Sequence, residues 1–144
     1  MALGACGFTP LYGTNGEAQA LLGKVRFVTP ETEFGFRVAR ALETRFGFAE
    51  ANAIEVTVDL SERQSSAAVT SDGDITRFDI TGVATWSVDG QANLEGQVQS
   101  FTGYSATGST VATQAAERDA RARLAQILAD QLSTDLIIAL GQPS

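Results

Sequence analysis

Few side chains in this chain of 144 residues could carry out chemistry, and their types restrict what that chemistry could be. The sequence contains no histidine and a single cysteine, Cys6. A Ser-His-Asp triad, a histidine proton shuttle and a histidine-ligated metal site are therefore excluded. One cysteine also forms neither an intrachain disulfide nor a cysteine cluster for zinc or an iron–sulfur centre. The sequence predicts neither a metal nor a cofactor.

The reactive group with the most specific surroundings is the thiol of Cys6, which follows Leu3, Gly4 and Ala5. This order resembles the bacterial lipobox, where a signal peptidase cuts before the cysteine and acyl chains such as palmitate are then attached to it. Each buried methylene contributes about 0.8 kcal/mol, so several chains form a firm membrane anchor. Only two residues precede Leu3, whereas a secretory signal has a charged start and an apolar run there. We predict lipidation at Cys6; the alternative is an incidental or buried free cysteine.

Carboxylates are the other candidates for chemistry, because paired acids catalyse glycoside hydrolysis. Four of them lie in or beside one polar stretch, at Asp59, Glu62, Asp72 and Asp74. Their neighbours are serine, threonine and glycine, which is typical of solvated turns. We therefore interpret these acids as turn residues and predict that the protein is not an enzyme.

The charge balance limits the partners. Ten Lys and Arg against 17 Asp and Glu give a formal net charge of −7, which repels polyphosphate and argues against nucleic-acid binding. The apolar fraction of 44% and the charged fraction of 19% are typical of a soluble globular protein. A chain of 144 residues is long enough to form one hydrophobic core without stabilisation by disulfides or metal ions. No stretch approaches about 18 consecutive apolar residues, so no membrane-spanning helix is predicted.

The chain is expected to divide into two parts. Residues 1–23 are predicted to hold the lipobox remnant and an extended tether, and residues 24–144 a single α/β sandwich domain. Glycine and proline recur between Gly7 and Gly16, which disfavours a helix there. Three large apolar residues stand in the same segment and could dock on the domain, on the bilayer or on a partner: Phe8, Leu11 and Tyr12.

A short strand and an amphipathic helix are predicted at the start of the domain. Val25 and Phe27 alternate with basic residues, as in a strand. A helix is expected from about residue 30, with Thr32 as its cap and Gly47 at its end. Apolar side chains recur at every fourth residue of this helix: Phe34, Val38, Leu42 and Phe46. This stripe is interpreted as core packing in preference to a ligand site.

Three strands are predicted between about residues 53 and 103, because apolar and polar residues alternate with period two. Asp72-Gly73 and Asp89-Gly90 supply the turn chemistry between them. The polar segment from Gln64 to Asp74 is expected to project from the sheet or to be mobile. One face of the sheet is expected to stay polar and to meet solvent or a polar partner lumen: Arg77, Asp79, Thr81, Thr85 and Ser87.

A long helix is predicted from about Ser109 to Leu140, since leucine occupies every fourth position from Leu124 onward. Two amphipathic helices need one apolar sheet face to cover. The predicted class is therefore α/β (α+β): a two-layer sandwich with an approximately four-stranded mixed sheet, covered on one face by two helices. The first strand is expected to join the sheet beside a meander strand, in parallel.

Two segments are similar to one known family. Residues 6–13 (Cys-Gly-Phe-Thr-Pro-Leu-Tyr-Gly) resemble the start of the mature LPS-assembly lipoproteins of the LptE family. Residues 112–125 (Ala-Thr-Gln-Ala-Ala-Glu-Arg-Asp-Ala-Arg-Ala-Arg-Leu-Ala) are similar to that family's final helix, and the order of elements agrees over nearly the whole chain. The resemblance implies a lipid-anchored outer-membrane protein of Gram-negative bacteria, on the periplasmic side. It would sit as a plug inside the LptD β-barrel, help that barrel assemble and contact lipopolysaccharide.

The same resemblance suggests two ligand-binding residues, because basic residues near the strand tips are associated with lipopolysaccharide contact in that family. Arg63 before the polar tip and Arg77 after it are the nearest matches. Flanking Glu62, Asp72 and Asp74 are expected to dilute their field. The alternative is two ordinary surface arginines paired across the hairpin with those acids, each pair worth under about 1 kcal/mol.

Other functions remain open at this point. The protein could be an accessory lipoprotein of another periplasmic lipid-transport system. It could also be a ligand-binding module, which would need a concave pocket with convergent polar groups. No such convergence is visible in the sequence.

Overall fold

The computed structural model describes residues 16–141 and contains one four-stranded sheet and three helices. In chain order the elements are α1 (Glu17–Ala20), β1 (Val25–Val28), α2 (Glu33–Phe46), β2 (Ile54–Val69), β3 (Ile75–Val88), β4 (Glu95–Ser105) and α3 (Thr110–Gly141). The strand order is β1-β2-β3-β4, with β1 parallel to β2 and the other pairs antiparallel. The predicted mixed sheet and α+β class are confirmed.

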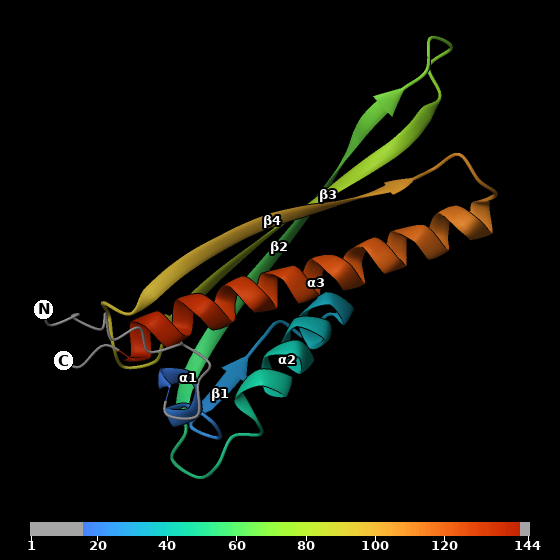
Figure 1. Ribbon diagram of the computed structural model, residues 1–144. Coiled ribbons are helices and arrows are strands. Elements are labelled where there is room, and N and C mark those ends of the chain that lie inside the picture. Colours follow the sequence, from blue (N-terminus) through green and yellow to red (C-terminus); the bar gives the residue numbers. More distant parts are fainter. Residues whose placement is uncertain (1–15, 142–144) are drawn as a thin grey trace, which may run out of the picture.

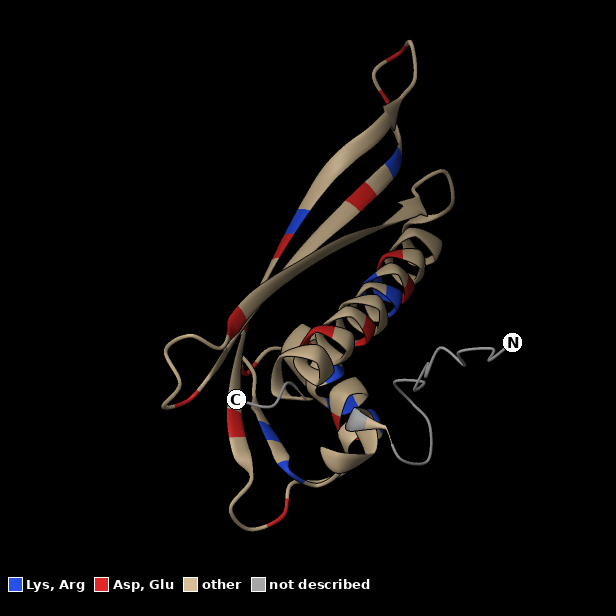
Figure 2. Cartoon of the chain, turned by 60° about the vertical axis from the view of Figure 1, so that its left-hand side comes forward, with Lys and Arg blue, Asp and Glu red and all other residues tan. Residues whose placement is uncertain are grey.

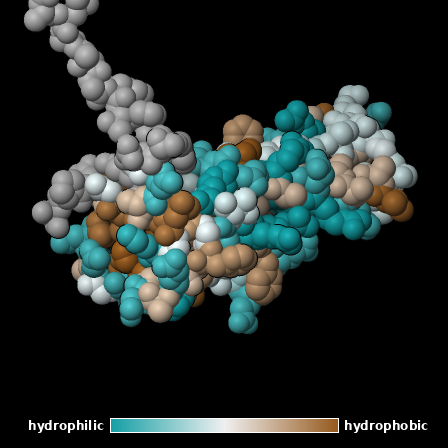
Figure 3. Space-filling view, turned by 60° about the horizontal axis from the view of Figure 1, so that its bottom comes forward, coloured by the Kyte–Doolittle hydropathy of each residue, from teal (hydrophilic) through white to brown (hydrophobic). Residues whose placement is uncertain are grey.

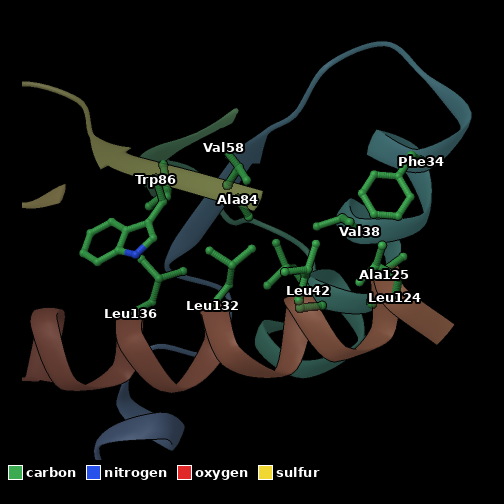
Figure 4. Close-up of a cluster of buried hydrophobic side chains, with 14 of the residues drawn as sticks. Phe34, Val38, Leu42, Val58, Ala84, Trp86, Leu124, Ala125, Leu132 and Leu136 are labelled. Carbon is green, nitrogen blue, oxygen red and sulfur yellow. The ribbon is translucent and has the colours of Figure 1, made fainter. Parts of the chain in front are cut away.

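Both long helices lie on the same face of the sheet, so the molecule has two layers (Figure 1). The core is the contact between these layers, where side chains from α2, α3 and the sheet meet (Figure 4). The leucine row of α3 is fully buried there: Leu124, Leu128, Leu132 and Leu136. By length and composition α3 could cross a membrane. Its apolar row instead packs on the sheet, as in the core helix of a two-layer fold.

The ends of α2 follow the local chemistry of the sequence. The Thr32 side chain accepts a hydrogen bond of 3.0 Å from the backbone N–H of Gly35, as expected for a cap. Gly47 ends the helix at a φ of 74°, a conformation that glycine adopts without steric cost. The predicted cap and stop are therefore confirmed, although the helix begins at Glu33 and not near residue 30.

The β2–β3 hairpin projects beyond the rest of the sheet (Figure 1). Pairing continues from Val56 opposite Val88 to Val69 opposite Ile75, with register shifts between Ser66 and Val69. The polar tip predicted at Gln64–Asp74 is thus mostly strand, and only residues 70–74 form the turn. Backbone pairing with β3 holds these small polar residues in extended form, although their side chains bury nothing.

The segment before β1 differs in part from an extended tether. Residues 17–20 form a single helical turn, α1, and the side chain of Leu21 is only 8% exposed in the core. Residues 1–15, with Cys6, Phe8, Leu11 and Tyr12, and residues 142–144 lie outside the described part of the chain. The division of the chain at residue 23 stays a prediction.

Candidate functional site

The side of the sheet that carries no helix holds the candidate site. Residues of β3 alternate between the two faces, and Gly82 lies on the covered face, because a Cβ placed there would be 2.9 Å from Leu128. Odd-numbered residues of β3 therefore point away from α3. We call the outer-facing residues near the hairpin the distal face: Arg63, Arg77, Asp79, Thr81 and Phe101.

The two arginines predicted to bind ligand lie on this same face but at different heights. Arg63 of β2 is opposite Thr81, whereas Arg77 of β3 is opposite Ala68. Arg77 and Thr81 are four residues apart, so the two arginines are separated by about 13 Å along the strands. Figure 2 shows blue bands, which mark Lys and Arg, at two different heights of the projecting hairpin. They can contact two groups of one extended ligand, but they do not converge on a single anion.

Arg77 makes an ion pair that depends on a glycine in the neighbouring strand. Its Nε lies 3.4 Å from Oδ1 of Asp79, and its side chain is 57% exposed. Gly103 of β4 is opposite Asp79, and a Cβ there would be 2.6 Å from Arg77 Nη2. The missing side chain thus leaves room for the guanidinium. The partner of Arg77 is Asp79, not the turn acids Asp72 and Asp74 that the sequence suggested.

The surroundings of Arg63 also differ from the prediction. Within residues 16–141 Arg63 makes no ion pair. Its neighbour Glu62 lies on the opposite face of β2, where Arg121 of α3 binds it at 3.1 Å. Glu62 is therefore not in contact with Arg63 and does not neutralise its positive charge.

Sequence reasoning missed the apolar part of this surface. Phe101 of β4 is 62% exposed and pairs with Thr81, which in turn pairs with Arg63, so the three form one row across the sheet. Val69 and Ile75 expose further apolar surface at the end of the hairpin. The exposure of Phe101 could have been predicted from the alternation of β4, because every second residue of a strand points to the same face and Phe101 falls on the outer one. A surface with separated cations and an exposed aromatic ring suits an anionic amphiphile.

Beneath the distal face the sheet is tied firmly to α3. Phe78 and Tyr104 stack with ring centroids 5.5 Å apart. The hydroxyl of Thr102 donates a 2.9 Å hydrogen bond to the carbonyl of Ala120 in α3. Burial, followed by the nearby charge of Glu117, raises the pKa of Tyr104. The distal face is therefore displayed on a fixed support as far as the end of β4.

A polar hollow of about 190 Å³ lies between the start of α2, β2 and α3. It contains three arginines and also acids that neutralise them, with Arg37 2.7 Å from Glu33 and Arg121 2.7 Å from Glu117. The hydrogen bond and charge of Arg37 lower the pKa of Glu33. Each pair lies within one helix, Arg37–Glu33 in α2 and Arg121–Glu117 in α3, and together they leave little net charge for a ligand.

An apolar hollow of about 200 Å³ lies at the other end of the molecule, between α1, α2 and α3. Exposed apolar side chains, Leu22 and Ile138 among them, occur in the same elements. Apolar side chains gather on part of the face that is turned forward from the bottom of Figure 1 (Figure 3). The hollow has few polar groups that converge, so it differs from the ligand pocket considered from the sequence.

The four acids considered for catalysis do not meet. Asp59 and Glu62 lie on opposite faces of β2, and both are strand residues, while Asp72 and Asp74 belong to the exposed hairpin turn. In the described part of the chain, no three histidine, cysteine or acidic side chains are grouped to hold a metal ion. The carboxylates therefore provide no paired acid and base.

Comparison with solved structures defines the class of protein. The fold is similar to that of a putative lipoprotein from Caulobacter crescentus CB15, with a TM-score of 0.69 and 19% identity over 89% of this chain and 100% of that one. It is also similar to the rare lipoprotein B from Shewanella oneidensis, with a TM-score of 0.59 and 12% identity over 83% of this chain and 98% of that one. A minor lipoprotein from Acinetobacter baumannii matches with a TM-score of 0.57 and 16% identity, over 82% and 93% of the two chains. The chain thus has the two-layer α+β fold found in these bacterial lipoproteins.

Sequence comparison then identifies the family. Residues 24–136 match the family model described as LptE, lipopolysaccharide-assembly. Among curated proteins, none matches this chain. Because the family match covers well over half of the residues, the chain belongs to the LptE family. Its general role is in lipopolysaccharide assembly, within a family that is not enzymatic.

Proposed function

We propose that this protein is the lipid-anchored plug subunit of a lipopolysaccharide translocon at the outer membrane. Acyl chains on Cys6 hold it on the periplasmic side. It associates with an LptD-like β-barrel, assists assembly of that barrel and contacts lipopolysaccharide on its way to the cell surface. The observation that carries this proposal is the LptE family match over residues 24–136.

The distal face supports contact with an anionic lipid. Arg63 and Arg77 offer two separate cations to phosphate groups. Phe101, on the edge strand β4, offers apolar surface on the same face. The net charge of −7 does not forbid this, because charges on an exposed surface are screened over about 8 Å at physiological salt. The electrostatic attraction that the ligand experiences therefore comes mainly from the two arginines beside it.

The outer layer of the sheet supports the plug role. Threonine, serine and glutamine side chains cover this face away from the hairpin tip, which suits contact with a hydrated barrel wall: Thr57, Ser61, Thr85, Ser87, Gln97 and Gln99. The helices cover the other face and provide the stability. Asp59 lies on the same face opposite Thr85, so this surface suits a hydrated wall and not an apolar one.

The proposal is tested by affinity purification of the lipidated protein from native membranes, with mass spectrometry of what co-purifies. The expected result is a large outer-membrane β-barrel in stoichiometric amount. A different lipid-transport complex would replace the proposed function, and the absence of any barrel would contradict it.

The anchor is tested separately with Cys6→Ala and matched Cys6→Ser proteins in membrane fractionation. Both variants should leave the membrane fraction in cells that lack the barrel, because the acyl chains are missing. If they remain in the outer-membrane fraction of those cells, lipidation at Cys6 is not the anchor.

A further inference from the structure

Among residues 16–141, the last strand of the sheet, β4, has one edge with no strand beside it. The direction of its backbone groups follows from two hydrogen bonds of 2.9 Å, in which Leu94 O accepts from Val88 N and Ala106 N donates to Thr76 O. Even-numbered residues thus bond to β3. Backbone N–H and C=O groups of the odd-numbered residues point to the open edge: Glu95, Gln97, Gln99, Phe101, Gly103 and Ser105.

This edge lacks the features that normally prevent strand pairing. Natural proteins protect edge strands with bulges, prolines or charges. The β3–β4 register is unbroken from Ser87 opposite Glu95 to Arg77 opposite Ser105, and Glu95 is the only charged residue in β4. Within residues 16–141, the bond recorded at this edge is a long one of 3.4 Å, from Arg123 Nη2 to Gly103 O. The β4 edge is therefore ready to accept another strand.

A hollow of about 390 Å³ lies directly below this edge, between β4 and α3. It is lined by Val98, Gln99, Gln131, Thr134 and Asp135. Oε1 of Gln131 is buried and finds no hydrogen-bond partner in the described part of the chain. A buried acceptor without a donor is costly, so this oxygen favours an incoming group that carries an N–H or O–H. The hollow thus adds a side-chain contact to the backbone groups of the edge.

We propose that the β4 edge binds an extended segment of the partner barrel protein, which pairs with β4 as a fifth strand. Rotation of the Gln131 side chain toward the hollow then lets its amide oxygen accept a hydrogen bond from the segment. Glu95 at one end of the edge favours a segment that carries a basic residue there, whereas Arg123 near the other end already pairs with Asp119 at 3.0 Å. This inference rests on the proposed function for the identity of the partner, but the strand-pairing geometry is a property of this chain.

A second copy of this chain meets a further requirement at this edge. A closed two-fold pair would place both α3 helices on the same face of the joined sheet. The α3 helix packs on both β4 and β3, so the two α3 helices would lie side by side and their facing side chains would have to interlock. A segment with no helix on that face avoids this requirement.

The pairing is tested with Gln99→Pro and the matched control Gln99→Ala. Proline removes one N–H that points to the open edge but none that bonds to β3, and edge strands tolerate it on that side. In the co-purification assay, Gln99→Pro should retain about tenfold less barrel than Gln99→Ala, with similar melting temperatures for the two variants. Equal barrel recovery with both folded variants would overturn the proposal, while loss of barrel from wild type as well would overturn the proposed function with it.

Photo-crosslinking gives a second readout that does not depend on the proline variant folding. A photoreactive residue at Gln97 should crosslink to the barrel, identified by mass spectrometry. The comparison position is Thr85, in the same row one strand further in, whose crosslinks to the barrel wall should map to a different peptide of the barrel from those of Gln97. Crosslinks from Thr85 but not from Gln97 would contradict edge pairing, and crosslinks from Gln97 to a second copy of this chain would replace the proposed partner.

Discussion

The two ends of the β2–β3 hairpin are stabilised by different interactions. At the proximal end, Val56, Val58, Ala84 and Trp86 are buried under α2 and α3. At the distal end, every residue from Ser61 to Ile75 is exposed. The first end is held by side-chain burial, which contributes about 1.5–3 kcal/mol for each large apolar side chain. The second is held by backbone pairing, which contributes about 0.5–1.5 kcal/mol per hydrogen bond.

This difference separates stability from recognition within one molecule. The distal hairpin adds little to the free energy of folding, because an isolated pair of strands is marginally stable in water. Its sequence is therefore free to serve ligand contact. Substitutions in the two regions should consequently act on different measurements, and the following variants test that separation.

The largest effect is expected for Leu128→Asp in the proximal core. Leu128 is fully buried and contacts the position of Gly82 on the sheet. An aspartate there would be a buried charge without a partner, at a cost of about 3 kcal/mol or more. Circular dichroism should show loss of the cooperative thermal transition. The matched control Ile138→Asp, 48% exposed on the same helix, should melt close to wild type; equal melting of all three proteins would contradict the assigned helix face.

The double variant Arg63→Glu with Arg77→Glu should weaken lipopolysaccharide binding by about tenfold, equivalent to about 1.4 kcal/mol. The melting temperature and barrel co-purification should be retained, because both side chains are exposed on the distal face. The control is Arg26→Glu with Arg40→Glu, which makes the same charge change on exposed proximal residues. If both double variants bind lipopolysaccharide equally in a direct binding assay, the two distal arginines have no special role.

A smaller loss, about threefold, is expected for Phe101→Ser. The ring is 62% exposed, so its removal should change the free energy of unfolding by less than about 0.5 kcal/mol. Binding of complete lipopolysaccharide should weaken more than binding of its deacylated form, since the ring offers only apolar surface. The two ligands can be compared by titration calorimetry, and equal losses for both would assign Phe101 no contact with acyl chains.

The smallest effect is a pH dependence from Tyr104 at the boundary between the two regions. Its pKa is raised from the ordinary value of 10.0, chiefly by burial, so the folded state favours the neutral hydroxyl. The stability from this group is complete below about pH 10 and is lost as the pH rises through the folded-state pKa. The stabilities of wild type and Tyr104→Phe, measured by urea unfolding, should differ by a constant amount up to pH 10. Above pH 10, stability should fall faster for wild type; parallel curves would contradict the linkage.

Much of the proximal region could be predicted from the sequence, because its signals are local. The cap at Thr32, the stop at Gly47 and the leucine row of α3 each follow from spacing along the chain. The parallel pairing of β1 with β2 was expected from the two-layer arrangement, and it is present. In this region burial and periodicity agree, so patterns of apolar residues suffice.

The distal region was harder to predict because its structure depends on residues far apart in the sequence. The polar run after Gln64 has no apolar alternation, and it is a strand only because β3 pairs with it. The Arg77–Asp79 pair needs Gly103 in the next strand. The faces of Glu62 and Phe101 were available from strand parity, but their partners Arg121 and Thr81 were not.

The single tryptophan of the chain makes the β4 edge observable. The indole of Trp86 lies against Gly96 of β4, where a Cβ would be only 2.6 Å from its Nε1. Its N–H donates a 3.4 Å hydrogen bond to Asp135, which lines the hollow under the edge. Indole emission depends on the polarity around this bond, so filling the hollow should shift the emission wavelength. Tryptophan fluorescence can therefore report docking at that edge without an added label.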